Sequence, residues 1–155
     1  MKKLLCMVLI GLLVGATALA AAPQFSDSLF DSAKQAVAYL ASGEYERLVN
    51  LLPFSDVAPS ASEWESFAGN YSDLNNVQDD YAVAWWTGNV WILAVPVQVP
   101  DSGSVEVLAL SSEDGATFNG YRYATWSQVE TACQQSDHVV WNEEYVGGTP
   151  TVVAD

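Results

Sequence analysis

The sequence predicts an α+β fold in which N-terminal helices pack on a curved antiparallel β-meander, followed by a late short helix and C-terminal strands. Two observations predict this class. Residues 27–68 place apolar side chains three and four positions apart, which is typical of amphipathic helices. Residues 81–123 instead form short apolar or alternating runs separated by turn residues, which is typical of strands. Helices followed by consecutive strands are the element order of an α+β domain.

Three helices are expected first, at Asp27–Ser42, at Glu44–Leu52, and from Ser60 or Ser62 to Ala68. Ser26 or Asp27 can cap the first helix, and Gly43 stands where a left-handed C-cap favours glycine. Pro53 ends the second helix because proline cannot continue it. The third helix opens with a capping box, made by Ser60 and Glu63 or by Ser62 and Glu65.

Four strands are expected next, at Tyr81–Thr87, Val90–Val99, Ser104–Leu110 and Ala116–Tyr123. Short turn-forming segments join them, so they should form an antiparallel meander. Pro96 and Pro100 lack backbone donors, which predicts a bulge or an unpaired end in the second strand. A late helix, Thr125–Ser136, opens with a capping box of Thr125 and Gln128, and Val139–Val146 and Thr149–Val153 follow as a last hairpin or a strand and a tail.

The first two strands form a hairpin that is apolar on both faces. With Gly88-Asn89 as a two-residue turn, Trp86 lies opposite Trp91, Trp85 opposite Ile92, and Ala84 opposite Leu93. Because side chains alternate between faces, each face then carries tryptophan and aliphatic residues. A sheet with one solvated face would instead alternate with polar residues. We therefore expect the helices to cover one face, and a helix, a partner chain or a ligand to cover the other.

The N-terminus has the pattern of a secretory signal peptide. Lys2 and Lys3 precede the apolar run Leu4–Leu13, and Ala18-Leu19-Ala20 is a small-x-small cleavage site. Ala20-Ala21-Ala22 also fits, but Pro23 would follow that cleavage site, so cleavage after Ala20 is favoured. The run is too short for a transmembrane anchor. The sequence thus predicts a signal peptide at residues 1–20 and one domain at residues 21–155, secreted or periplasmic in a bacterium, with no stable membrane span after processing.

Charge and cysteine content limit which partners and which disulfides are expected. The net charge is −14, and it becomes −16 once Lys2 and Lys3 are removed. Such acidity repels nucleic acid and anionic membranes, so neither is an expected partner. Only Cys133 survives processing, so an intramolecular disulfide is excluded. It falls on the inward side of the late helix and is expected to pack as a small apolar residue.

Part of the chain resembles a known fold family. The pair of helices from Ala36 to Leu52, joined at Gly43-Glu44-Tyr45 and followed by a small helix and a curved meander, is similar to exported NTF2-like (cystatin-like α+β) bacterial domains of unknown function. The resemblance covers about residues 27–120, and the helix Thr125–Ser136 departs from it. It implies a cone-shaped sheet whose concave face lines a pocket under the helices and whose convex face forms a dimer.

Two candidate sites give weak signals. His138, with Asp137, Glu143 or Glu144 beside it, could act as a general base, but its polar junction position favours an exposed side chain. The segment Asp73–Asp80 offers oxygen ligands for Ca²⁺, but Val77 interrupts them and the tight-turn glycine is missing, which favours a solvated loop. The sequence holds no nucleophile elbow or phosphate loop, so neither a catalytic residue, a metal nor a cofactor is assigned.

The aromatic residues remain as the best candidates for binding. Tryptophan rings stack on ligands or fill partner pockets. The expected function is an exported, non-catalytic binding or interaction module, whose partner is a small molecule, a protein or a second copy of the chain in a homodimer. The alternative is a small secreted enzyme with an NTF2-like pocket and a carboxylate/histidine acid–base pair. The expected binding residues are Trp85, Trp86, Trp91, Tyr121 and Tyr123.

Overall fold

The computed structural model describes residues 21–72, 74, 82–97 and 105–142. The expected signal peptide, most of the Asp73–Asp80 segment, Glu143, Glu144 and the last expected strand lie outside these residues. The described elements, in chain order, are α2 (Ser28–Ser42), α3 (Tyr45–Leu51), α4 (Ala61–Ala68), β1 (Val83–Trp86), β2 (Trp91–Val97), β3 (Glu106–Ser112), β4 (Gly120–Thr125), α5 (Trp126–Gln134) and β5 (Val139–Trp141).

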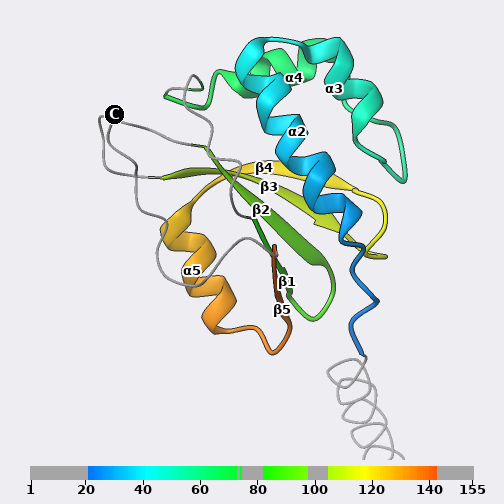
Figure 1. Cartoon of the computed structure of the whole chain (residues 1–155), viewed down its shortest axis with the longest axis vertical. Coiled ribbons are helices and arrows are strands. Elements are labelled where there is room, and N and C mark those ends of the chain that lie inside the picture. The colour runs from blue at the N-terminus through cyan, green and yellow to red at the C-terminus, as the bar shows by residue number, and fades with distance from the viewer. Residues whose placement is uncertain (1–20, 73, 75–81, 98–104, 143–155) are drawn as a thin grey trace, which may run out of the picture.

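The strands form a five-stranded antiparallel sheet in the order β4-β3-β2-β1-β5. The sheet is open and curled, with α2, α3 and α4 on one side and α5 on the other (Figure 1). The predicted α+β class is therefore confirmed, with helices first, a meander second, and a late helix and strand at the end. β5 adds to the edge at β1, so β4 forms the opposite edge.

The register of the β1–β2 hairpin is the predicted one. Trp86 pairs with Trp91, Trp85 with Ile92, and Ala84 with Leu93. Thr87 and Val90 close the two-residue turn, because the Thr87 amide donates to the Val90 carbonyl at 2.9 Å. Gly88 has a φ of +101°, a backbone conformation that glycine adopts without a steric penalty at this turn position.

The helices cover one face of the hairpin. Trp91 and Leu93 point toward α2 and α4, where they join a buried cluster with Leu40 and Trp64. Gly43 ends α2 with a φ of +71°, as the predicted left-handed cap requires. The capping box of Ser60 and Glu63 opens α4, and of the two boxes that the sequence allowed it is this one that forms.

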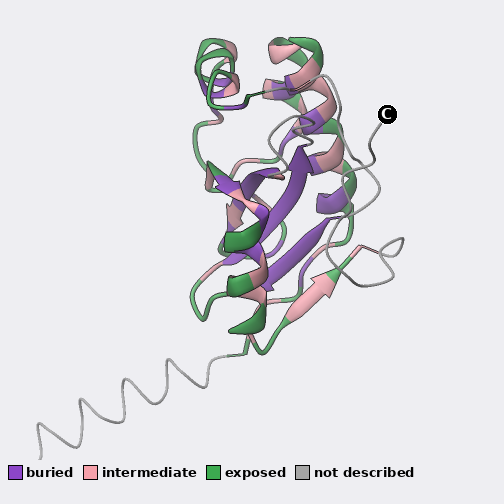
Figure 2. Ribbon diagram, turned by 90° about the vertical axis from the view of Figure 1, so that its left-hand side faces the viewer, coloured by how far each residue is buried: buried purple, intermediate pink, exposed green. Residues whose placement is uncertain are grey.

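The late helix covers the second face. Trp126 and Val129 of α5 are buried against Val83, Trp85 and Ala94. Figure 2 shows buried residues on both sides of the central strands, while the outer surface of α5 is exposed. Of the three covers expected for this face, the described residues thus supply the helix. The capping box of Thr125 and Gln128 is present at its start, as predicted.

The segment that precedes α2 is bound into the fold. The Trp91 indole N–H donates to the Pro23 carbonyl at 2.9 Å, and Phe25 packs its ring against those of Phe30 and Trp91. The Ser26 amide donates to the Gly115 carbonyl at 2.8 Å. A Cβ on Gly115 would collide with the Gln24 backbone, so this close approach requires glycine.

Two local predictions were wrong. The third and fourth strands begin later than expected, and for the fourth strand the reason is that Phe118 pairs in parallel with Phe54, which takes residues 116–119 out of the meander. No side-chain hydrogen bond caps α2 at Asp27. For Pro96 the second of the two predicted alternatives is the one that forms: pairing between β2 and β3 continues through Pro96 and Val107 without a bulge, but pairing with β1 stops at Ala94, so the end of β2 is unpaired on that side. A proline is tolerated there because its missing donor is not needed for the β1 pairing.

Replacing Trp126 by alanine should uncover the second face. The free energy of unfolding is expected to fall by about 3–5 kcal/mol, because the side chain is almost fully buried and leaves a cavity. Urea unfolding followed by circular dichroism measures it. Trp141→Ala is the control, since this ring is 39% exposed although it contacts Trp126. Equal losses in the two variants would contradict the role of α5 as the cover.

Candidate functional site

The expected binding residues are divided between surfaces. Trp85 and Trp91 are each 4% exposed, and Trp86 is half-buried. Trp86 and Trp91 lie together on the helix-covered face, with ring centroids 5.7 Å apart, whereas Trp85 lies on the face under α5. Tyr121 and Tyr123 are on the helix side of the distant edge strand β4. The tryptophans of the hairpin thus serve mainly as core, and a binding role for the five residues stays a prediction.

An aromatic cluster links α4 to the edge strand β4. Tyr121 packs on Trp64 and Phe67, with ring centroids 4.5 and 5.0 Å apart. Tyr71 packs on Tyr123 at 5.3 Å. These contacts shield the helix side of an edge strand, which would otherwise present open apolar surface. Tyr123 nevertheless stays 37% exposed.

Beside this cluster lies a buried carboxylate that sequence reasoning missed. Glu106 is 6% exposed at the start of β3. Its Oε2 accepts from the Ser72 amide at 3.0 Å, and its Oε1 accepts from the Ser72 hydroxyl at 3.1 Å and from the Tyr123 hydroxyl at 2.9 Å. The sequence signal was available, because Glu106 shares its strand face with Leu108 and Leu110 and so points inward.

The carboxylate shifts the acidity of its neighbours. Burial raises the pKa of Tyr71 well above the usual range, and the charge of Glu106 raises it further. The pKa of Tyr123 is also raised, first by burial and then by its hydrogen bond to Glu106. Tyr71 donates to the Val107 carbonyl at 3.0 Å. Every polar group in this network thus has a partner, which favours a structural tie between residue 72, β3 and β4 over a free general base.

The other titratable residues considered from the sequence, His138 and Cys133, lie outside the hydrogen-bond network of Glu106. The His138 side chain is exposed, as expected, and its amide donates to the Ser136 hydroxyl at 3.2 Å. Cys133 is half-buried against the second core, and burial raises its pKa to about 11, so the thiol stays protonated at neutral pH. In the part of the chain that the structure describes, no three His, Cys, Asp or Glu side chains gather as metal ligands.

Comparison with known proteins identifies no relative. No family model, no curated protein and no solved structure matches this chain. Among the described helices, none combines the length and the apolar character needed to cross a membrane.

Several hollows on the described surface are lined with acidic residues. One between α3 and α4 includes Glu44, Glu46 and Glu65, and its cation Arg47 is paired with Glu44 at 3.3 Å. Another, beside Trp141, includes Asp27 and Asp31. In a chain with 19 acidic and 5 basic residues this is the expected surface, and it marks no particular ligand.

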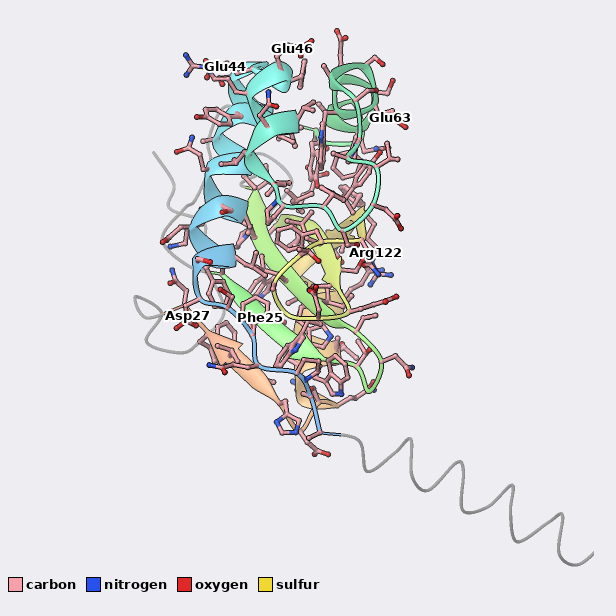
Figure 3. All side chains as sticks on the ribbon, turned by 90° about the vertical axis from the view of Figure 1, so that its right-hand side faces the viewer. Phe25, Asp27, Glu44, Glu46, Glu63 and Arg122 are labelled. Atoms are coloured by element: carbon pink, nitrogen blue, oxygen red, sulfur yellow. The ribbon has the colours of Figure 1, made fainter. Side chains whose placement is uncertain are left out.

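A further hollow differs in its charge. It encloses about 230 Å³ on the α5 side of the sheet, and no carboxylate lines it. Its lining residues are Ile92, Ala109, Leu110, Ser111, Gly120, Tyr121 and Arg122. Figure 3 shows Arg122 extending outward from the region of β4, well below Glu44 and Glu46 at the far end of the helical layer.

The path of α5 explains why this hollow is open. The helix starts directly after Thr125, at the C-terminal end of β4, and the chain then reaches Val139, which pairs with Trp85. The helix α5 therefore crosses the sheet diagonally, as Figure 1 shows. The helix does not cover the corner where β4, β3 and β2 lie side by side, at Gly120, Ser111 and Ile92. We call this lined corner the β2–β4 hollow.

Replacing Glu106 by glutamine should weaken the tie between residue 72 and the sheet. The free energy of unfolding is expected to fall by about 1–3 kcal/mol, because the amide presents its own donor to hydroxyl and amide donors. Urea unfolding measures it, and the exposed Glu65→Gln is the matched control. A loss no larger than that of the control would show that the carboxylate is dispensable.

The raised tyrosine pKa values also predict a pH dependence. The folded state disfavours tyrosinate, so its stabilisation is complete below about pH 10 and is lost as pH rises toward the raised folded values. The free energy of unfolding should therefore fall above about pH 10, by up to about 1.4 kcal/mol per pH unit for the buried Tyr71, and by less for Tyr123, whose exposed ring is screened by solvent. Tyr71→Phe should make this fall shallower, and identical slopes in the two proteins would contradict the assignment.

Proposed function

We propose that the protein is an exported, non-catalytic binding module that takes a small ligand into the β2–β4 hollow. The observation that carries the proposal is that this corner is the part of the second hairpin face that α5 leaves open. Its floor is apolar, with Ile92 and Ala109, and its rim is polar, with Ser111 and Arg122. An apolar concavity with a few polar groups at its edge is the usual form of a small-molecule site.

Export is supported by the basic and apolar pattern of the first residues, which is that of a signal peptide. The segment Pro23–Ser26 is held by Trp91 and Gly115, so the residues just after the favoured cleavage site at Ala20 are part of the packed domain. An acidic surface suits a protein that stays soluble outside the cytoplasm.

The order of elements still supports the proposed NTF2-like relationship, with helices over one face of a curled sheet. In that family the opposite face often forms a dimer. Here α5 occupies much of that face, with Trp126 and Val129 buried beneath it. We therefore favour ligand binding in the corner over dimerisation through the whole face.

The enzyme alternative gains less support. His138 is exposed, and Glu106 has hydrogen bonds on both oxygens, so neither is a base aimed into the hollow. A general base must reach its proton within hydrogen-bond distance of a bound substrate. Glu143 and Glu144 lie outside the described residues.

Ser111→Leu tests the site. Ser111 is half-buried at the rim, so a larger apolar side chain should fill the hollow without entering the close-packed core. In amide NMR spectra, small apolar fragments should shift Ile92, Ala109, Gly120 and Arg122 in the unmodified protein, and these shifts should vanish in the variant. Ser127→Leu, on the exposed surface of α5, is the control and should keep them. Fragment shifts that gather at another surface in all three proteins would refute the proposed site.

A further inference from the structure

The charge of the residues that line the β2–β4 hollow indicates which class of ligand it would bind. We infer, on the basis of the proposed function, that the hollow binds a short apolar molecule that ends in a carboxylate. The apolar body would lie on Ile92 and Ala109, and the carboxylate would receive hydrogen bonds from the Arg122 guanidinium.

Arg122 is available for such a ligand. Of the three cations that follow the expected signal peptide, Arg47 is paired with Glu44 and lies over the Tyr39 ring at 5.9 Å. Lys34 is half-buried on α2. Arg122 is exposed, and no carboxylate within the described ranges pairs with it. An arginine offers a planar fork of donors that matches a carboxylate in two parallel hydrogen bonds.

Asp114 does not compete with a ligand for Arg122. Asp114, in the turn between β3 and β4, accepts from the Ala116 amide at 2.9 Å and from the Thr117 amide and hydroxyl at 2.8 Å. These bonds lower its pKa to about 2 and hold its charge within the turn. The net charge of −16 that follows removal of Lys2 and Lys3 repels anions at long range, but salt screens exposed charges beyond about 8 Å at physiological ionic strength. The contact with Arg122 therefore decides the local preference.

The size of the hollow limits the ligand. Its volume of about 230 Å³ lies below the range of about 300–1,000 Å³ that is usual for sites of drug-sized molecules. The apolar part must therefore be short, and a six-carbon chain is a suitable probe. Hexanoate, hexanol and hexylamine share that chain and differ only in the charge of the end group.

The experiment compares these three probes on the purified protein by amide NMR titration. Hexanoate should shift Ile92, Ala109 and Gly120 with a Kd about fivefold lower than that of hexanol, as an exposed ion pair of about 1 kcal/mol requires. Hexylamine should bind most weakly. Arg122→Gln should remove the difference between hexanoate and hexanol, whereas Arg47→Gln, which removes a cation outside the hollow, should keep it.

The outcomes separate the two proposals. If hexanol and hexanoate bind the hollow with equal Kd, the carboxylate inference is overturned while ligand binding in the hollow stands. If Arg122→Gln keeps the preference for hexanoate, the assignment of Arg122 is overturned. If none of the three probes shifts the lining residues, both the inference and the proposed site fail.

Discussion

Trp85 and Ile92 lie on one side of the β1–β2 hairpin, and Trp86 and Trp91 lie on the other. Neither side can face water without exposing large apolar rings, so the chain must place a layer on each. A buried tryptophan removes roughly 150–250 Å² from water, which is worth on the order of 4 kcal/mol or more. This requirement explains why the described helices lie on both sides of the sheet, with α2, α3 and α4 on one side and α5 on the other. The sheet is thus the middle layer of the protein.

The edges of the sheet pose a second constraint. At β4 the helix side is protected by the rings of α4, which pack on Tyr121, and by Glu106, which holds the Tyr123 hydroxyl and residue 72. Just before β4, the Ser55 amide donates to the Phe118 carbonyl at 2.9 Å, and Phe118 donates to Pro53 at 2.7 Å. Aromatic packing, a buried carboxylate and a short parallel bridge together hold β4 in place and cover the helix side of this edge strand.

Local signals predicted the fold where the cause lies within a few residues. Gly88-Asn89 defined the hairpin turn and so the register, because the side-chain period of two leaves no freedom once the turn is known. The capping boxes at Ser60 and Thr125 likewise set the starts of α4 and α5. The parallel bridge of Phe54 with Phe118 could not be predicted, because its partners are far apart in sequence and no periodicity relates them. For the same reason the sequence did not reveal that Ser72 would reach Glu106.

The site depends on the path of α5 across the sheet, which the sequence also could not show. The helix α5 has nine residues, which span about 14 Å at the rise of an α-helix. Five strands span about 19 Å across the sheet. A helix that begins at the end of β4 and runs diagonally toward β5 therefore leaves a corner of β2, β3 and β4 uncovered. Gly120 keeps this corner free of a further side chain, since a Cβ at this position would meet the Ser111 hydroxyl. The corner lies to one side of the path of α5, so the helix covers Trp85 but leaves the exposed Arg122 beside an apolar floor.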